Sequence, residues 1–395
     1  MYLTIAQKDL ARALSLVSSI VGNGQIQMPI LKYVLLCTEP DGLALLAANE
    51  DTRIRVRVPA TVQASDTLLL PAQTFSRFVG DLPTAPVTLM SPSPTDQTAL
   101  QLRCQQSKAN FKQGALSVAE FPLVQFLEEG EEVFTLDCEL LKEIVEQVAF
   151  AAAANANRPV LEGMRVVCQN GFATFLAADS FRLAIRTIPI PDQRVTAELL
   201  IPASVLRTVA RLLPSSGAVR VGRSRDGRQL LVQTREMDLS SRLLEGAFPD
   251  VRSLLALEAP TRVVLPTSVL TNAVHLMSSF ARENKHVLRC TVEASALLLE
   301  AEAADLGANE VRLTEEVLIS GPTLSVMIHH SYLTEALAAI PTQQVAVECF
   351  DARRPVTIKP VGPLDARQII MPMMLESTPT PTPAQAEATA TSPSR

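Results

Sequence analysis

Short runs of alternating apolar and polar residues, and longer stretches with one apolar face, follow one another along the chain. Residues 53–58 alternate arginine with branched apolar residues, the pattern of a half-buried β-strand. Leu10, Leu14, Val17 and Val21 recur at spacings of three and four, which predicts an amphipathic helix. The predicted fold class is therefore α+β, with helices packed against antiparallel sheets.

This order of elements occurs three times, about 130 residues apart. A second strand-to-helix step, near residues 70–71 and 201–202, keeps the same register and has a less regular third copy. A repeat of this length is a domain, because solenoid repeats span roughly 20–50 residues. The three apolar strands that open the repeats lie at residues 3–5, 134–136 and 263–265.

The repeats predict three similar domains and a tail. We expect the boundaries near two acidic stretches that contain Gly or Pro. The tail is rich in Ser, Thr, Pro and Ala and cannot offset the entropy of ordering, so we expect it to be disordered. The predicted domains cover residues 1–127, 128–258 and 259–375, followed by the tail at 376–395.

The repeats also suggest residue-by-residue matches. Aligning repeats one and two pairs Asp41-Gly42 with Asn170-Gly171, and Arg53 with Arg182. A residue that recurs in both copies is expected to serve the fold, so one interpretation of Arg182 is a structural role.

Composition narrows the class of protein. Hydrophobic residues make up 47% of the 395, typical of a globular chain, and no apolar run approaches the roughly 20 residues of a membrane span. The six cysteines are far apart and form no CxxC pair, which favours reduced thiols and a cytoplasmic location. The net charge of −6 neither indicates nor excludes a nucleic-acid partner, because a local field can oppose the total.

Enzymatic chemistry has little support in the sequence. The four histidines (His275, His286, His329 and His330) form no nucleophile, metal or acid–base arrangement, and no glycine-rich phosphate loop occurs. The 329–330 pair is interpreted as the junction between a strand and a helix. We therefore expect no catalytic residue, no metal and no cofactor.

Several motifs together resemble one protein family. They are residues 161–163, 178–184, 246–250 and, above all, the ending Ile369-Ile370-Met371-Pro372-Met373. In order and spacing they resemble the bacterial DNA polymerase III beta subunit, the sliding clamp family, over about residues 1–375. The resemblance implies three equivalent domains per chain and two chains that close head to tail into a ring around duplex DNA.

The resemblance also implies the function. Such a homodimer holds DNA without reading its sequence and tethers the replicative DNA polymerase for processive synthesis. Partners, including the clamp loader, bind through short linear peptides, and no membrane is involved. The alternatives are a monomeric protein-binding scaffold and a specialised paralogue that does not serve the replicase. A mass in solution separates the monomeric scaffold from a clamp.

Lys and Arg side chains that line the inside of such a ring would attract the phosphate backbone of the DNA and still let the duplex slide. At the positions that match Lys8 and Arg12, repeat two has Glu139 and Glu143, which reduce the positive charge of this lining. For each candidate the alternative is an ordinary solvated helix face. The candidates, two of them in a loop that matches a DNA-contacting loop of the family, are Lys8, Arg12, Arg77, Asn155, Arg158, Arg207, Arg211 and Arg282.

The family's partner pocket lies on domain two beside the C-terminal segment. Phe181 and Met374 stand where many members have polar or basic residues, which makes this pocket more apolar. The alternative is that residues 371–375 form a terminal strand packed in a core. Carried over by position, the pocket comprises Leu161, Ala178, Ser180, Phe181, Arg182, Leu183, Pro249, Ser253, Leu254, Ile369, Met371, Pro372, Met373, Met374 and Leu375.

Opposite charges on the first and third domains suggest the ring closure. A single strand over residues 100–111 is expected to carry the basic side, and the acidic side lies near an apolar helix that ends at Phe280. The alternative is two unrelated charged surfaces. The predicted interface residues are Arg103, Lys108, Phe111, Phe280, Glu300 and Glu302.

Overall fold

The computed structural model describes residues 1–21, 28–91, 98–112, 116–154, 157–255 and 258–374. The described chain forms two compact units. The first comprises Met1–Val251 with Asp365–Arg367, and the second begins at Arg252. The tail that the sequence analysis places at 376–395 lies outside the described residues.

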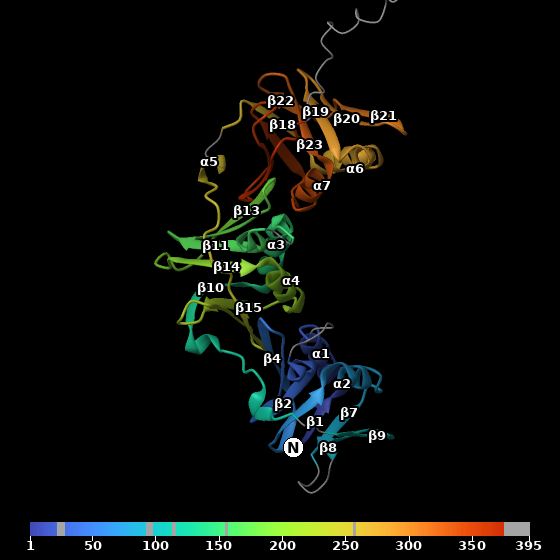
Figure 1. Ribbon diagram of the computed structural model, residues 1–395, viewed down its shortest axis with the longest axis vertical. Helices are drawn as coiled ribbons and strands as arrows, with labels where there is room; N and C mark the ends of the chain where they lie inside the picture. The colour runs from blue at the N-terminus through green and yellow to red at the C-terminus, as the bar shows by residue number, and fades with distance from the viewer. Residues whose placement is uncertain (22–27, 92–97, 113–115, 155–156, 256–257, 375–395) are drawn as a thin grey trace, which may run out of the picture. The chain divides into compact units, whose positions relative to one another are not determined.

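The first repeat, drawn in blue in Figure 1, contains two helices and nine strands within its described residues. The helices α1 and α2 pack against each other. In α1 the side chains of Leu10, Leu14 and Val17 are buried, as the spacing predicts. The elements are β1 (Tyr2–Ala6), α1 (Gln7–Ser18), β2 (Tyr33–Glu39), β3 (Gly42–Ala48), β4 (Thr52–Pro59), β5 (Thr61–Ala64), β6 (Thr67–Pro71), α2 (Ala72–Gly80), β7 (Pro86–Met90), β8 (Thr98–Cys104) and β9 (Ser107–Lys112).

The second repeat has the same plan, with α3 packed against α4. Each of these helices begins directly after a strand, as in the first repeat. The elements are β10 (Glu131–Asp137), α3 (Cys138–Val148), β11 (Gly163–Gln169), β12 (Phe172–Ala178), β13 (Arg182–Pro189), β14 (Ala197–Pro202), α4 (Ala203–Leu212), β15 (Ala218–Arg223), β16 (Gln229–Gln233) and β17 (Met237–Arg242).

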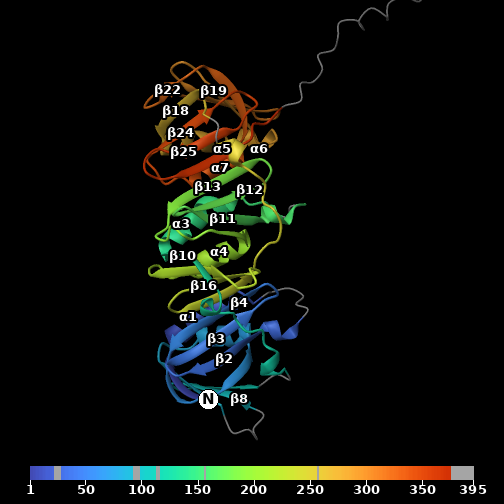
Figure 2. The same ribbon diagram turned by 90° about the vertical axis from the view of Figure 1, so that its left-hand side faces the viewer.

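Antiparallel sheets support both repeats of the first unit. One sheet has the order β5-β1-β7-β8-β9, another has the order β10-β15-β16-β17-β4-β3-β2-β6, and four further strands follow the order β14-β11-β12-β13. The pairing of β17 with β4 joins repeat two to repeat one, and Figure 2 shows β2, β3 and β4 from the sheet side. At this seam the buried carboxylate of Asp238 forms an ion pair with Arg57 and lies 3.9 Å from Arg55.

The prediction of one continuous strand over residues 100–111 is wrong, because the chain reverses within this range. The structure has a hairpin of β8 and β9, in which Arg103 lies opposite Lys108. The chain reverses at Gln105, whose φ of 50° lies in the left-handed region used by tight turns. The hairpin makes β9 the edge of its sheet.

The second unit holds the third repeat, in which α6 packs against α7. Its sheets follow the orders β21-β20-β19-β23 and β26-β25-β24-β18-β22. The elements are α5 (Arg252–Leu255), β18 (Thr261–Pro266), α6 (Thr267–Glu283), β19 (Val287–Val292), β20 (Leu297–Ala303), β21 (Gly307–Leu313), β22 (Leu318–Ser320), β23 (Leu324–His329), α7 (His330–Ala338), β24 (Gln344–Cys349), β25 (Val356–Pro360) and β26 (Ala366–Ile370).

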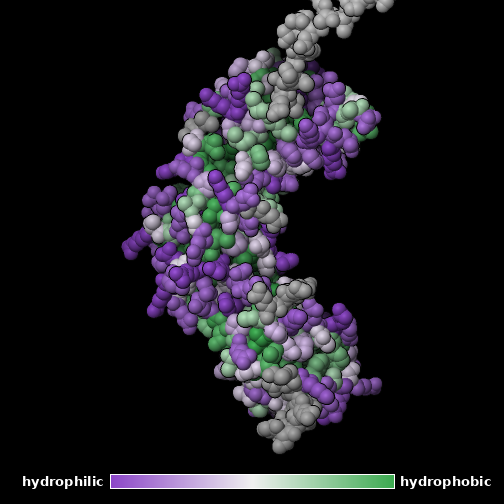
Figure 3. Space-filling model, viewed as in Figure 1, coloured by the Kyte–Doolittle hydropathy of each residue, from purple (hydrophilic) through white to green (hydrophobic). Residues whose placement is uncertain are grey.

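These observations confirm helices packed against antiparallel sheets. All six cysteines are free, and burial raises the pKa of the Cys168 thiol to about 11, so this thiol stays neutral. Among the described residues, no helix is long and apolar enough to cross a membrane. On the face shown in Figure 3, hydrophilic residues predominate and apolar residues form separate groups.

Candidate functional site

The turn between β12 and β13 presents an exposed aromatic side chain. The Asp179 carboxylate accepts hydrogen bonds from the backbone N–H groups of Phe181 at 2.9 Å and Arg182 at 3.0 Å. Ser180 has a φ of 60°, a conformation that non-glycine residues seldom adopt. The turn leaves Phe181 59% exposed, so its ring is available to a partner.

Arg182 fastens this turn to the body of repeat two. Its Nε donates to the Asp179 carboxylate at 2.9 Å, and its Nη2 donates to the Phe150 carbonyl at 3.0 Å. The guanidinium also lies over the Phe150 ring, 5.3 Å from its centroid. These contacts occupy much of its donor capacity, so Arg182 positions the turn.

The matching turn in repeat one corrects the sequence alignment. The Asn49 side chain accepts from the N–H groups of Asp51 at 3.0 Å and Thr52 at 2.7 Å, as Asp179 does in repeat two. The counterpart of Arg182 is therefore Thr52, and the pairing of Arg182 with Arg53 is wrong. The hairpin register agrees, because Ala48 lies opposite Arg53 where Ala178 lies opposite Leu183.

The same shift applies at the other end of this hairpin. Gly42 is the first residue of β3 and Phe172 the first residue of β12, so these two correspond. The pairing of Asp41-Gly42 with Asn170-Gly171 is thus also off by one residue. A one-residue error is easy to make in sequence because both turns contain a Gly, yet it changes every side chain that is compared.

The remaining predicted pocket residues of repeat two lie in several different elements. Leu161 is buried in a short 3-10 helix at Pro159–Glu162. Ala178 ends β12, and Leu183 is buried in β13. Pro249 is half-buried near the end of the repeat.

The predicted pocket residues of the second unit are described separately. Met371 is 36% and Met374 66% exposed, and the Met373 N–H donates to the Met327 carbonyl at 2.8 Å. Strand β26 ends at Ile370, just after the buried Ile369, so the alternative of a terminal strand packed in a core is wrong for the described residues 371–374. Pro372 is half-buried, Ser253 and Leu254 lie in α5, and Leu375 lies outside the described residues.

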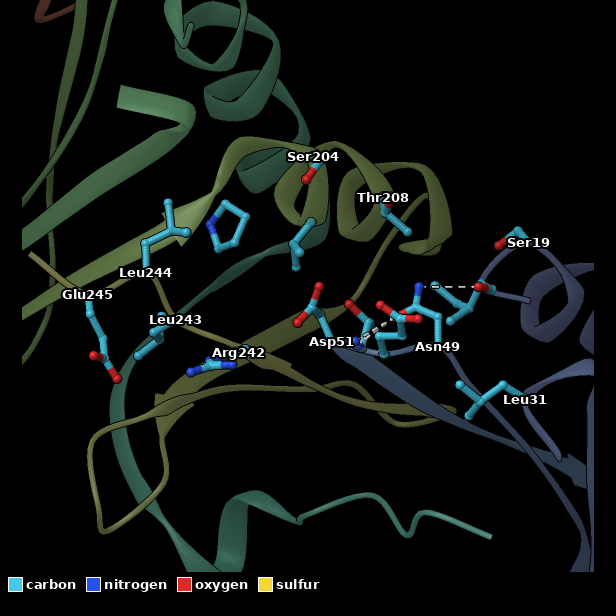
Figure 4. A pocket seen from close by; sticks show the side chains of 15 residues that line it. Ser19, Leu31, Asn49, Asp51, Ser204, Thr208, Arg242, Leu243, Leu244 and Glu245 are labelled. Atoms are coloured by element: carbon cyan, nitrogen blue, oxygen red, sulfur yellow. Dashed lines mark hydrogen bonds between the residues drawn. The ribbon is translucent and has the colours of Figure 1, made fainter. Parts of the chain in front are cut away.

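A cleft of about 710 Å³ lies in the first unit, where repeat one meets repeat two. Its walls are the β3–β4 turn, the helix α4 and the segment after β17, whose side chains Figure 4 shows as sticks. Four of its lining residues are the repeat-one counterparts of Leu161, Ser180, Phe181 and Arg182. They are Leu31, Glu50, Asp51 and Thr52.

The other wall of this cleft matches the C-terminal ending. Strand β17 ends at Arg242 and strand β26 at Ile370, so residues 243–245 correspond to residues 371–373. Leu243, Leu244 and Glu245 all line the cleft. The structure thus brings together, in repeats one and two, the counterparts of positions that the sequence analysis assigned to a pocket.

The sequence did not identify a group of stacked His and Tyr side chains in the second unit. His286 stacks on His329 with centroids 4.8 Å apart, and His329 stacks on Tyr332 at 4.2 Å. His329 and Tyr332 flank the start of α7 as Pro202 and Val205, both cleft-lining, flank the start of α4. The repeat itself was the signal that could have identified them. The interpretation of 329–330 as a strand-to-helix junction is confirmed.

The predicted DNA-binding residues fall into two groups. All seven described candidates are exposed, and the first group comprises Lys8, Arg77, Arg158 and Arg282. Three others have protein partners: Arg12 pairs with Glu236 at 3.3 Å, Arg207 donates to the Ala149 carbonyl at 2.5 Å, and Arg211 donates to the Thr208 hydroxyl at 3.4 Å. Asn155 lies outside the described residues.

The predicted interface residues lie on or near two sheet edges. In the first unit β9 is an edge strand with Lys108 exposed, while Phe111 packs edge-on against Phe75. In the second unit β21 is an edge strand. Glu300 of β20 lies opposite Glu310 of β21. Arg103 and Glu302 are exposed, and Phe280 is half-buried against the core.

Three repeats of helices packed against antiparallel sheets define the class of proteins that are built from copies of one α+β domain. The N-terminal, central and C-terminal domains of the DNA polymerase III beta subunit match residues 1–125, 135–250 and 252–374. The chain belongs to the DNA polymerase III beta subunit family. This is the family of the beta sliding clamps, processivity factors of DNA replication without catalytic activity.

Individual relatives agree over nearly the whole chain. The beta sliding clamp of Synechocystis sp. is 27% identical over 393 residues, covering 95% of this chain and 100% of that protein. The beta sliding clamp of Staphylococcus aureus is 24% identical over 357 residues, covering 88% and 92%. The solved DNA polymerase sliding clamp of Bacillus subtilis has a TM-score of 0.88 at 23% identity, covering 95% of this chain and 100% of that one. Three clamp domains per chain follow from these matches.

Proposed function

We propose that two copies of this chain close head to tail into a ring around duplex DNA and tether the replicative polymerase. The observation that carries ring closure is the pair of sheet edges. Edge strand β9 carries Lys108 with Arg103 on its neighbour, and the edge formed by β21 and β20 carries Glu310, Glu300 and Glu302. Unpaired edges of opposite charge favour pairing between chains.

Phe111 and Phe280 extend this interface with apolar surface. Both are half-buried against their own cores, so each retains surface that a second chain can cover. Burial of apolar surface contributes roughly 25 cal/mol per Å², whereas the charges mainly set orientation. A closed ring also covers both edges.

DNA contact rests on the exposed basic residues. Lys8, Arg77, Arg158 and Arg282 are the stronger candidates, because Arg12, Arg207 and Arg211 already have protein partners; Asn155 remains a candidate by its loop position alone. The exposed Glu139 and Glu143 of α3 oppose the attraction. Each phosphate contact adds to the salt dependence of binding, so a sparse lining gives weak affinity and relies on topology for retention.

Partner peptides, including those of the polymerase and the clamp loader, are assigned to the predicted pocket residues of repeat two and the C-terminal ending. Support comes from exposed Phe181, Met371 and Met374. Further support comes from the cleft of the first unit, whose lining includes the counterparts of Ser180, Phe181 and Met371. Flexible methionines adapt to several ligands. The domain limits 1–127, 128–258 and 259–375, and a cytoplasmic location, belong to the same proposal.

The ring is tested by retention on DNA. The full chain is loaded by a clamp loader onto nicked circular DNA, and bound protein is measured in moderate salt before and after the circle is linearised. We expect retention on the circle and loss from the linear form. Equal loss from both would contradict encirclement.

A matched pair of variants connects retention to the sheet edge. Lys108→Glu places a negative charge opposite the acidic edge, so we expect a monomeric mass in solution and no retention on the circle. Lys32→Glu changes an exposed lysine away from both edges and should remain dimeric. A wild-type chain that is monomeric at micromolar concentration would favour the monomeric scaffold instead.

A further inference from the structure

The cleft between repeats one and two has an apolar floor. Ile20, Leu31, Val205 and Leu243 line it, and each is less than 10% exposed. Its volume of about 710 Å³ falls within the roughly 300–1,000 Å³ of ordinary ligand pockets. The floor offers an environment for an aliphatic side chain.

The rim of the cleft carries an excess of negative charge. Glu50, Asp51 and Glu245 are exposed carboxylates, and Arg242 is the one basic residue of the lining. No ion pair joins any of these four side chains to another described residue. Carboxylates without a cationic partner, beside an apolar floor, favour a ligand that brings its own positive charge.

The cleft is elongated. Figure 4 shows Glu245 at one end of the row of lining side chains and Ser19 at the other, with Asp51 between them. Asp51 comes from repeat one and Glu245 from repeat two, so a ligand that meets both must cross from one wall to the other. An extended peptide does this, because successive side chains point to opposite sides.

We propose that this cleft binds a short extended peptide segment with an aliphatic anchor beside lysine or arginine. The anchor lies on the apolar floor beside Leu243, and the cation lies between Asp51 and Glu245. The site depends neither on ring closure nor on the pocket proposed for repeat two. It is a second peptide site whose chemistry differs, because Glu50 and Asp51 stand where repeat two has Ser180 and Phe181.

The test uses the full chain and two fluorescein-labelled, acetylated hexapeptides. One alternates leucine with lysine and the other alternates leucine with glutamate. Fluorescence anisotropy at fixed moderate salt should show the lysine peptide binding at least tenfold more tightly than the glutamate peptide. Absence of lysine-peptide binding up to millimolar concentration, or equal binding of the two peptides, overturns the proposal.

Two variants locate the binding. Ser204 is exposed on α4 and lines the cleft, so Ser204→Trp should fill it and weaken lysine-peptide binding at least tenfold. Ser15→Trp, on an exposed position of α1 outside the cleft, should leave binding unchanged. Lysine-peptide binding that survives Ser204→Trp places the peptide elsewhere and overturns the proposal.

A charge variant covers the case in which the tryptophan disturbs folding. Asp51→Asn combined with Glu245→Gln changes only exposed side chains and keeps their size. We expect lysine-peptide binding to weaken about fivefold to tenfold with the thermal unfolding temperature unchanged. Unaltered affinity in this double variant would show that the rim carboxylates do not recognise the cation.

Discussion

The β3–β4 turn of repeat one and the β12–β13 turn of repeat two share a backbone design but present different chemistry. In each, an Asn or Asp side chain accepts the N–H groups two and three residues later. The tip is Glu50-Asp51 in one and Ser180-Phe181 in the other. In the two proposed sites the repeated fold thus supplies the same turn, and the residues at its tip set the chemistry that is offered to a partner.

The segments that follow β17 and β26 differ in the same direction. Residues 243–245 read Leu-Leu-Glu, whereas residues 371–373 read Met-Pro-Met. Leu243 is 8% exposed and Met371 is 36% exposed. The segment after β17 contributes to a closed aliphatic floor beside a charged rim, whereas the segment after β26 exposes flexible thioether side chains, which can adapt to different neighbours.

The largest effect is expected from exchanging the turn tips. Phe181→Asp gives repeat two the acidic tip of repeat one, so capture of a polymerase-derived peptide should weaken about 100-fold, or ~2.7 kcal/mol, as for loss of an aromatic hot spot. Isothermal titration measures the change. Asp51→Phe, the reciprocal change, should leave this capture intact. A weak response to Phe181→Asp, or an equal response to both, would show that the tip is not the discriminating element.

The wall residues should separate stability from binding. Leu243→Ala removes buried apolar atoms and should lower the free energy of unfolding by ~2 kcal/mol. Met371→Ala should change it by less than ~0.5 kcal/mol, because the side chain is already partly in solvent, while weakening capture of the polymerase-derived peptide. Urea unfolding checks the first pair of values. A large stability loss in Met371→Ala would instead assign that methionine to a core.

Arg182 tests the corrected alignment of the two turns. Arg182→Ala removes an ion pair and a hydrogen bond to the Phe150 carbonyl, so unfolding should become easier by ~1–2 kcal/mol. Arg53→Ala should change the free energy of unfolding by less than ~0.5 kcal/mol, because Thr52 is the true counterpart. Chemical denaturation of both variants measures this difference. Similar losses in both would show that Arg53 stabilises its own repeat as much as Arg182 does.

Periodicity and repetition predicted the fold class and the three repeats, because alternation and helical spacing report burial directly. They did not predict the β8–β9 reversal at Gln105, which depends on one left-handed residue that is not a glycine. The off-by-one match at Arg182 has the same origin. Turn geometry is set by side-chain-to-backbone hydrogen bonds, such as those of Asn49 and Asp179, which a comparison of letters does not reveal.

The candidate site shows a similar limit. The positions in repeat two and in the ending came from motif resemblance, and their counterparts Leu31, Asp51 and Leu243 were not recognised, because they share little sequence with them. His329 and Tyr332 lie in the third copy of the strand-to-helix step, which the sequence does align with Pro202 and Val205, but nothing in that alignment marks a site. At the turn tips and after the last strands, the repeats match in position but not in side chain, so the structural register connects them.

The smallest effect concerns pH and again contrasts the two units. All four histidines lie after residue 251, in the second unit. Burial, with the nearby His286, Arg282 and His275, lowers the pKa of His330, although its ring bond to the Val274 carbonyl opposes the shift. Because the unfolded chain then binds the proton more readily, stability falls as pH drops below about 6.5 toward the lower folded pKa.

Hydrogen exchange measures this response unit by unit. From pH 7 to 5.5, the opening free energy of core amides in α6 should fall, after correction for intrinsic rates, while that of β17 in the histidine-free first unit should change less. His330→Gln removes the titrating ring and should flatten the response of α6. If the decline persists in His330→Gln, another group carries it. If both units decline equally, the buried imidazole does not distinguish them.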